Sequence, residues 1–260
     1  MNESLVKYLA GLLDADGSLS FNFKRDQNRE DRHFAGLTLK LAASDAVDRR
    51  GFVDSLPSQT GFGSVYREGR NDQFKNWIVT KRADLEMLLP RLIKHMVIKA
   101  RHWEWMLNEW RNLRRTSVST DEMGALKAAS KGSRLERVGP VKPKNHPTWA
   151  WVAGYIDGDG TYYRHFDKNQ NYWSIHVSAV AHINDRVGLD LLAKAFGGHF
   201  HPQGQCPDVI IWRRNLGARD ADFALGFLPN VVKHSRLKRH KIDGIIHHHR
   251  QRLNLQEAAA

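Results

Sequence analysis

Hydrophobic and polar residues alternate along short stretches in two separate parts of the chain. Residues 19–24 and 37–42 place an apolar side chain at every second position, and residues 162–167 are interpreted in the same way. This period is typical of strands that bury one face and leave the other polar. Strands are predicted at residues 19–24, 37–42, 63–67, 74–79, 162–167, 172–181, 199–202 and 209–213.

Apolar patterns with helical spacing lie before and between these strands. In residues 100–113 the large apolar side chains form a single stripe, which favours a core helix over a surface that stacks nucleic-acid bases. Helices are predicted at residues 4–13, 45–56, 100–113, 148–156 and 185–196. The order helix, two strands, helix, two strands, helix occurs twice. The sequence therefore predicts an α+β fold with one antiparallel sheet in each half.

An internal repeat supports this division. Residues 9–17 read LAGLLDADG and residues 152–160 read VAGYIDGDG, at an offset of 152 − 9 = 143 positions. A Lys-His pair followed by a further lysine recurs at 94–99 and 233–238, at an offset of 233 − 94 = 139 positions. Two similar halves follow from the two matches.

The segment between the two halves is rich in Ser, Thr, Gly, Lys and Pro. Such a composition is typical of a linker, within which residues 121–131 form a short predicted helix. We therefore expect an N-terminal half at 1–114, a linker at 115–147 and a C-terminal half at 148–260.

The charge of the chain changes what such a fold is expected to bind. The 260 residues carry a formal charge of +12, while 41% are hydrophobic, so the positive charge lies on a folded body. Such a surface attracts polyanions, with nucleic acid the first candidate and an acidic membrane surface the weaker alternative. A single cysteine, Cys206, excludes an internal disulfide, and no apolar run is long enough to cross a bilayer. We expect a soluble protein of a reducing compartment, either the cytoplasm or nucleoid or an organelle matrix.

The repeated nonapeptide has a physical meaning of its own. Small residues on one face let two helices approach closely. The expected helix-interface residues are Ala10, Gly11, Ala153 and Gly154. If the two motif helices pack side by side, their C-terminal ends bring Asp16 and Asp159 together. Carboxylates at two helix C-termini repel each other unless a cation lies between them, and Mg²⁺ is the natural hard cation beside phosphate.

The first acid of each motif, Asp14 or Asp157, competes for this role. A structural interpretation is favoured for both, in which the carboxylate accepts hydrogen bonds from nearby backbone N–H groups at the helix exit. Direct metal binding is the alternative.

The two nonapeptides resemble the paired motifs of the single-chain LAGLIDADG homing endonucleases, and the similarity covers nearly the whole chain. The resemblance implies two pseudo-symmetric αββαββα halves, each with a saddle-shaped DNA-binding sheet, packed through the two motif helices. It implies that Asp16 and Asp159 are catalytic and bind the metal, and we expect further metal ligands at Ala15 and Gly158. Mg²⁺ is the expected cofactor, Mn²⁺ is expected to substitute for it, and Ca²⁺ is expected to bind without supporting cleavage.

The resemblance also implies a catalytic lysine in each half, matched here by Lys99 and Lys238. An ammonium group at these positions could stabilise charge on phosphoryl oxygens or orient water, and a surface lysine is the alternative. Many relatives have a polar residue at the end of the second strand, where this chain is aligned with Ala43 and His182. The two active centres are therefore expected to differ.

Polar positions of the predicted strands are candidates for reading DNA, and solvated strand positions are the alternative for each. Residues 74–79 carry apolar side chains on both faces, so their DNA-facing side is not assigned. The candidate DNA-binding residues are Ser20, Asn22, Lys24, Thr38, Lys40, Tyr66, Glu68, Tyr163, His165, Asp167, His182 and Arg213.

Together these observations indicate an endonuclease of the intron-homing type. We expect a monomer that needs no protein partner and no membrane, and that binds a long, non-palindromic double-stranded DNA site. The resemblance implies that it hydrolyses both strands and leaves 3′ overhangs. The alternatives are an RNA-splicing maturase and a sequence-specific DNA-binding protein without nuclease activity, both on the same fold.

Overall fold

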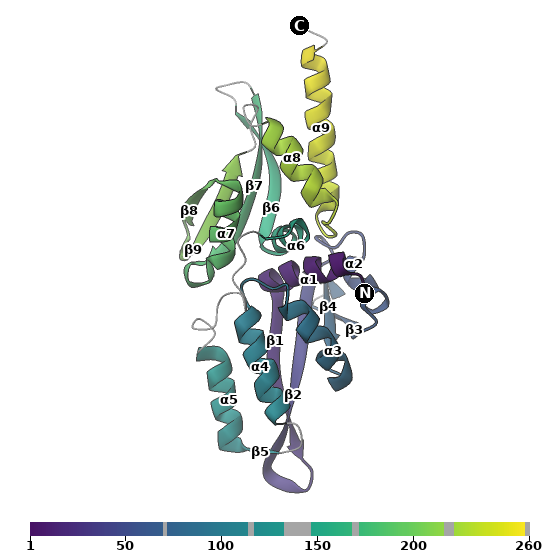
Figure 1. The fold of residues 1–260 in the computed structure, drawn as a ribbon, viewed down its shortest axis with the longest axis vertical. Helices are drawn as coiled ribbons and strands as arrows, with labels where there is room; N and C mark the ends of the chain where they lie inside the picture. The colour runs from purple at the N-terminus through teal and green to yellow at the C-terminus, as the bar shows by residue number, and fades with distance from the viewer. Residues whose placement is uncertain (70–71, 114–116, 133–146, 168–171, 216–220, 258–260) are drawn as a thin grey trace.

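Two halves with the same order of elements lie end to end along the long axis of the molecule (Figure 1). The computed structural model describes residues 1–69, 72–113, 117–132, 147–167, 172–215 and 221–257. The first half consists of α1 (Glu3–Asp16), β1 (Gly17–Asp26), β2 (Arg29–Ser44), α2 (Phe52–Thr60), β3 (Ser64–Glu68), β4 (Phe74–Val79), α3 (Arg82–Ile93) and α4 (Ala100–Asn112).

The second half follows a short strand and a helix, β5 (Val118–Ser119) and α5 (Thr120–Gly132). It consists of α6 (Trp149–Asp159), β6 (Gly160–Asp167), β7 (Tyr172–His182), the 3₁₀ helix η3 (Ile183–Asp185), α7 (Val187–Phe196), β8 (His199–Gln203), β9 (Cys206–Asn215), α8 (Ala221–Val232) and α9 (Arg239–Glu257). Among the described residues, none of these helices is long and apolar enough to cross a membrane.

Each half contains one antiparallel sheet. The strand orders are β1-β2-β4-β3 and β6-β7-β9-β8, with β5 added beside β2. The α+β class predicted from the alternating patterns is therefore confirmed. One face of each sheet packs against helices and is apolar, as fully buried Leu39 and Trp77 show in the first half and Trp212 in the second. The opposite face, here called the open face, carries the polar positions.

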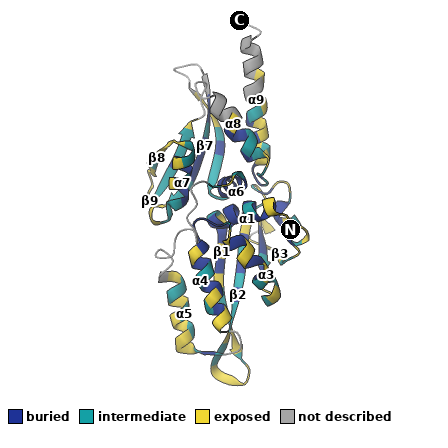
Figure 2. Ribbon diagram, viewed as in Figure 1, coloured by how far each residue is buried: buried dark blue, intermediate teal, exposed yellow. Residues whose placement is uncertain are grey.

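The core is continuous through both halves and includes the two motif helices. Figure 2 shows buried residues concentrated in α1 and α6, where the halves meet, while the tip of the β1–β2 hairpin is exposed. Both helices run further than the apolar pattern predicts, because α1 continues from the expected end at residue 13 to Asp16, and α6 continues from residue 156 to Asp159. The acids thus belong to the last helical turns.

The prediction of a helix at residues 45–56 is wrong for its first half. Residues 45–50 form turns, and α2 begins only at Phe52. Gly51, with φ of 67°, has a left-handed backbone that a continuous helix does not allow. The Asp48 carboxylate then accepts hydrogen bonds from the backbone N–H groups of Phe52 (2.6 Å) and Val53 (2.9 Å), which gives α2 its N-terminal partner.

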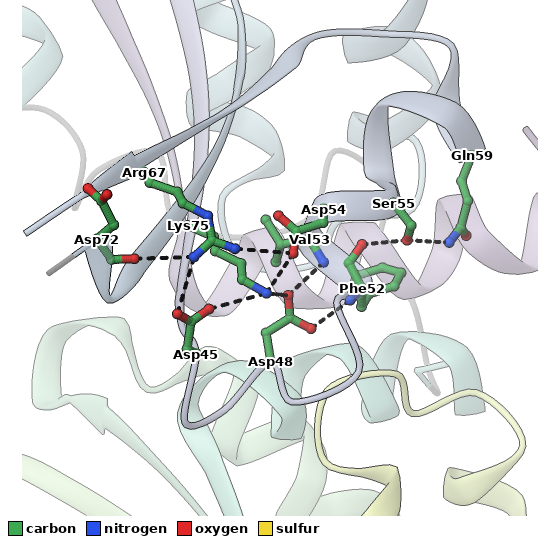
Figure 3. Close-up of polar contacts among 10 residues, drawn as sticks. All are labelled: Asp45, Asp48, Phe52, Val53, Asp54, Ser55, Gln59, Arg67, Asp72 and Lys75. Atoms are coloured by element: carbon green, nitrogen blue, oxygen red, sulfur yellow. Dashed lines mark hydrogen bonds and ion pairs between the residues drawn. The ribbon is translucent and has the colours of Figure 1, made fainter.

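A buried lysine holds this turn in place. Lys75 lies on the helix-covered face of β4, where its Nζ contacts carboxylate oxygens of Asp54 at 2.6 Å, Asp45 at 3.2 Å and Asp48 at 3.4 Å (Figure 3). Arg67 adds a second cation, 3.3 Å from Asp45. Burial opposes the lysine charge, but the hydrogen bonds to Asp54 and Asp45 raise the pKa of Lys75 above its ordinary value. The cluster therefore ties the β2–α2 turn to the sheet.

The segment after α4 is attached to the first half. β5 pairs with β2, and α5 packs against β1 and β2. The short helix predicted at residues 121–131 is confirmed, while residues 133–146 lie outside the described part of the chain. The division of the chain at 114 and 147 stays a prediction.

Candidate functional site

The two motif helices meet backbone to backbone. The small residues predicted for this interface are all buried there, namely Ala10, Gly11, Ala153 and Gly154. A Cβ atom added at Gly11 would collide with the carbonyl oxygen of Trp151, and one added at Gly154 would collide with that of Tyr8. The close approach therefore requires glycine at both positions.

This approach brings the C-terminal acids of both helices together. Asp16 and Asp159 are the last residues of α1 and α6, and their carboxyl groups are hydrogen-bonded to each other. Desolvation and the Asp16 charge raise the pKa of Asp159 to about 7. Desolvation also raises the pKa of Asp16, against the opposing charges of Lys238 and Lys99. At neutral pH the pair thus tends to hold a shared proton, as neighbouring carboxylates do.

The donor set at this pair fits a hard divalent cation. Two carboxyl groups in contact offer oxygen ligands, and the carbonyl oxygens of Ala15 and Gly158 belong to the residues just before them. Within the described residues, no group of three or more His, Cys, Asp or Glu side chains gathers into a metal site. Further oxygen ligands would therefore come from backbone, water or a bound phosphate.

Lys99 lies beside this pair but points its ammonium group at the end of α1. Its Nζ donates to the carbonyl oxygens of Leu13 (3.0 Å), Ala15 (2.8 Å) and Gly17 (2.8 Å), and the residue is only 9% exposed. These carbonyls belong to the last turn of the helix and its exit, where backbone acceptors lack partners within the helix. An ammonium group has three N–H donors, which these three acceptors match in number.

Lys238 repeats this arrangement in the second half. Its Nζ donates to the carbonyl oxygens of Ile156 (3.0 Å), Gly158 (3.1 Å) and Gly160. Burial lowers the pKa of Lys238, and the charges of Asp157 and Asp16 oppose that change. Both lysines thus hold the helix exits and place a positive charge near the acid pair. The expected contact with a phosphoryl oxygen stays a prediction.

The first acid of the N-terminal motif has a structural role, as favoured from the sequence. Asp14 is buried and accepts hydrogen bonds from the backbone N–H groups of Val97 (2.6 Å) and Lys99 (2.8 Å). Its third donor is the indole Nε1 of Trp151 on the other motif helix, at 2.8 Å. Burial raises the pKa of Asp14, against these hydrogen bonds.

Asp157 does the same in the second half with different donors. It accepts hydrogen bonds from the backbone N–H groups of Arg236 and Leu237, from the Ser235 hydroxyl and, across the interface, from the Tyr8 hydroxyl at 2.8 Å. Each first acid therefore ties the segment before its own lysine to its helix and also binds the opposite motif helix. Sequence reasoning missed Trp151 and Tyr8, because only the crossing of the helices brings them to these acids.

The candidate DNA-binding residues of the first half share the open face of its sheet. Directly opposed residues of an antiparallel pair point to the same side, so the pairs Ser20 with Thr38 and Ser18 with Lys40 define this face. Asn22 donates to the Thr38 hydroxyl at 2.6 Å. The candidates that the strand register places there are Ser20, Asn22, Lys24, Thr38, Lys40, Tyr66 and Glu68.

The sequence did not assign which side of β4 faces DNA, and the same strand register decides it. Asn76 lies opposite Ala42 and Tyr66, and Ile78 opposite Lys40, so these two belong to the open face. Trp77 and Val79 are fully buried on the other face. Asn76 is a further residue on the open-face side of its strand that alternation alone could not assign, but it is buried, with 1% of its surface exposed.

In the second half, Tyr163, His165 and Arg213 lie on the open face. The Asp167 side chain lies outside the described ones. The register adds three residues that the sequence analysis missed: His176 opposite Tyr163, His199 opposite Arg213, and His201 opposite Ile211. All three fall within predicted strands, but their side of the sheet depends on pairing with neighbours.

The pairing of Ala43 with His182 as equivalent positions is wrong by one residue. Gly17 pairs with Leu41 and the equivalent Gly160 pairs with Ala179, an offset of 179 − 41 = 138. His182 therefore corresponds to Ser44, since 182 − 138 = 44. Ala43 belongs to the core. The His182 Nδ1 accepts a hydrogen bond from the backbone N–H of Asn184 at 3.2 Å and caps η3, on the open-face side of its strand.

Comparison with known proteins agrees with this geometry. No protein-family model matches the sequence. The chain is 26% identical over 121 residues to DNA endonuclease I-CreI of Chlamydomonas reinhardtii, a match that covers 46% of this chain and 71% of that protein. It is 21% identical over 170 residues to the probable intron-encoded endonuclease Cox1-I1b of Schizosaccharomyces pombe, with 62% of this chain but only 41% of that protein covered.

Solved structures extend the similarity over the whole fold. I-SmaMI bound to an uncleaved DNA target with calcium ions superposes with a TM-score of 0.66 at 15% identity, covering 90% of this chain and 85% of that one. The LAGLIDADG homing endonuclease I-GzeII in complex with its DNA target gives 0.61 at 14% identity, covering 88% and 90%. The chain therefore has a two-domain, pseudo-symmetric fold with paired acid-bearing helices, similar to that of I-SmaMI and of the LAGLIDADG homing endonuclease I-GzeII. The resemblance of this chain to the single-chain LAGLIDADG homing endonucleases is thereby confirmed.

Proposed function

We propose that this protein is a site-specific DNA endonuclease of the homing type. As a monomer it binds a long double-stranded site across both sheets and hydrolyses both strands at the junction of the halves, leaving 3′ overhangs. The observation that carries the proposal is the contact of Asp16 with Asp159 between two open-faced sheets. The names of the sequence and structural relatives point to the same activity.

The charge balance supports a duplex as the partner. Lys plus Arg exceed Asp plus Glu by 40 − 28 = 12, and Lys24, Lys40 and Arg213 lie on the open faces. A two-stranded antiparallel ribbon, such as β1–β2 or β6–β7, is narrow enough to enter the major groove, where side chains reach base edges. Neutralised phosphates supply affinity, while open-face side chains supply sequence preference.

The target is proposed to be non-palindromic because the two open faces carry different side chains. The motif offset of 143 relates Ser20 to Tyr163 and Asn22 to His165. The first half has a small hydroxyl where the second has an aromatic ring, and an amide where the second has an imidazole. The two halves therefore present different hydrogen-bonding groups to the two half-sites. Each half-site therefore needs its own base sequence.

The acid pair is proposed to hold Mg²⁺, together with the carbonyl oxygens of Ala15 and Gly158. A bound divalent ion activates water and stabilises negative charge on a phosphodiester. The protein's own contribution is to hold two carboxyl groups at one point through the glycine contact of α1 and α6, and to keep two ammonium groups nearby. Lys99 and Lys238 support the helix exits and lower the proton affinity of Asp16.

The test is a cleavage selection from a randomised duplex library, with Mg²⁺, Mn²⁺ or Ca²⁺, followed by sequencing of the cut ends. We expect one non-palindromic site, 3′ overhangs, cleavage with Mg²⁺ and Mn²⁺, and binding without cleavage with Ca²⁺. D16N and D159N are expected to bind but not to cut, whereas D121N, on exposed α5, is the matched control and retains cleavage.

Two results would contradict the proposal. Tight, sequence-specific binding without cleavage under every metal condition would identify a non-cleaving DNA-binding protein. Stimulation of intron splicing without DNA cleavage would identify a maturase.

A further inference from the structure

The open face of the second sheet carries a group of histidines that has no equivalent among the described residues on the open face of the first sheet. Its members are His165 on β6, His176 on β7, and His199 and His201 on β8. Together with Tyr163 and Arg213 they are here called the histidine face. On the first sheet, the strand register places Lys24, Asn22 and Thr38 on the open face, and His33 on the other side, opposite Arg25.

The rings of the histidine face pack against one another instead of extending separately into solvent. Tyr163 and His176 stack with centroids 4.9 Å apart and an interplanar angle of 9°. His199 and His201 meet edge to face at 4.4 Å, and the Arg213 guanidinium lies 6.0 Å from the Tyr163 ring. The face is therefore a preorganised aromatic and imidazole surface.

Its environment disfavours protonated imidazole in the free protein. Burial lowers the pKa of His176, and the charges of Arg213, His165 and His199 lower it further. Burial likewise lowers the pKa of His199, with His201, Arg213 and Arg214 adding to the effect.

The charged groups that face these two imidazoles from β6, β8 and β9 are thus all cationic or titratable to cations. Within the described residues, no Asp or Glu side chain contributes to either environment. Asp167 lies on β6 two positions beyond His165, with its side chain outside the described ones.

We propose that the histidine face is a proton-dependent DNA-contact surface, in which His176 and His199 take up protons when duplex phosphates approach. This inference rests on the proposed function, because it requires the open faces to bind DNA. A phosphate supplies the negative charge that the face lacks and favours the imidazolium form. Since the bound state then holds more protons than the free state, affinity must rise as pH falls.

The coupling belongs to one half-site only. The first open face carries the lysines Lys24 and Lys40 where the second carries imidazoles. The second half-site is therefore held more weakly at alkaline pH than the first. Proton uptake by one imidazole changes affinity by up to about tenfold per pH unit between its free and bound pKa values.

The experiment measures binding of a fluorescently labelled random-sequence duplex by anisotropy in EDTA at constant ionic strength, from about pH 6 to pH 8. The wild-type protein is expected to bind roughly tenfold or more tightly at the acidic end. H176Q/H199Q is expected to bind like the wild type at the alkaline end and to lose most of the pH dependence. K40Q, the matched control on the first open face, is expected to bind more weakly at every pH and to keep the wild-type pH slope. Thermal melting of each variant at both ends of the range checks the fold.

Two results would overturn the inference while leaving DNA binding intact: a wild-type affinity that does not change with pH, or an unchanged pH slope in the folded double variant. A wild-type protein that binds no duplex at any pH would instead refute the proposed function, and the inference with it.

Discussion

The ammonium group of Lys99 gives the sharpest test of how the active centre is held. K99M keeps the length of the side chain and removes three hydrogen bonds to the carbonyl oxygens of Leu13, Ala15 and Gly17. Each buried acceptor left without a partner costs about 1–3 kcal/mol, and relief of the lysine's own desolvation offsets part of this cost. We expect a net loss of about 2–4 kcal/mol.

For a chain of this size, such a loss lowers the melting temperature by roughly 4–15 °C. The assay is thermal melting of the wild-type protein, K99M and K131M, the last removing an exposed lysine of α5 as the control. K99M also removes a charge that lowers the pKa of Asp16 and Asp159. The acidic limb of the cleavage rate against pH is therefore expected to shift to higher pH in K99M.

A different outcome would refute this reasoning. If K99M melts like the wild type and shows an unshifted pH profile, yet loses cleavage, then Lys99 acts on the substrate itself. The hydrogen bonds to the helix exit would in that case contribute little to its role.

Three further predictions concern the junction and the buried cluster. D159N is expected to melt roughly 5 °C higher than the wild type at pH 8, and at the same temperature as the wild type near pH 4. The reason is that the raised pKa of Asp159 makes its ionisation above about pH 7 unfavourable to the folded state. Equal melting curves of the two proteins at both pH values would contradict this prediction. K75M leaves the buried Asp48 carboxylate without a cation, while Arg67 still contacts Asp45 and Asp54, and is expected to cost about 3–5 kcal/mol in urea unfolding. The expected cost for K81M, whose partner lies 3.9 Å away at the surface, is less than about 1 kcal/mol. G154A is expected to destabilise the folded protein by about 3 kcal/mol or more, because the added Cβ meets the Tyr8 carbonyl oxygen. G124A, where the added Cβ enters open space beside α5, is expected to stabilise the protein by about 0.5–1 kcal/mol. Similar melting of the two variants would refute the close contact of the motif helices.

Much of this architecture could be predicted from the order of the residues. The repeated nonapeptide predicted the two halves, the glycine contact and the meeting of two acids, because small residues and acids at equal positions of two helices have few other arrangements. The hydrophobic pattern predicted four strands of each sheet, though not the short β5 beside β2, since a half-buried strand needs one apolar face. These are local or repeated patterns, which a sequence displays directly.

Other features depend on contacts between distant segments. Nothing near Asp14 or Asp157 in the sequence indicates that Trp151 and Tyr8 donate to them across the interface. The start of α2 at Phe52 depends on Asp48, which is held by Lys75 from a strand that follows it. Apolar spacing alone predicts that this helix begins too early, because the spacing carries no information about the left-handed backbone of Gly51 or the distant Lys75 cation.

The sequence by itself determined that two acid-bearing helices would meet between two antiparallel sheets, because the pattern and its repeat are written in consecutive residues. Only the tertiary structure decided that Lys99 and Lys238 turn inward to the helix exits, that His182 corresponds to Ser44, and which histidines share one open face. Hydrogen-bond partners and strand register are properties of chain segments that are far apart in sequence, and they are fixed only when the packed core brings those segments together.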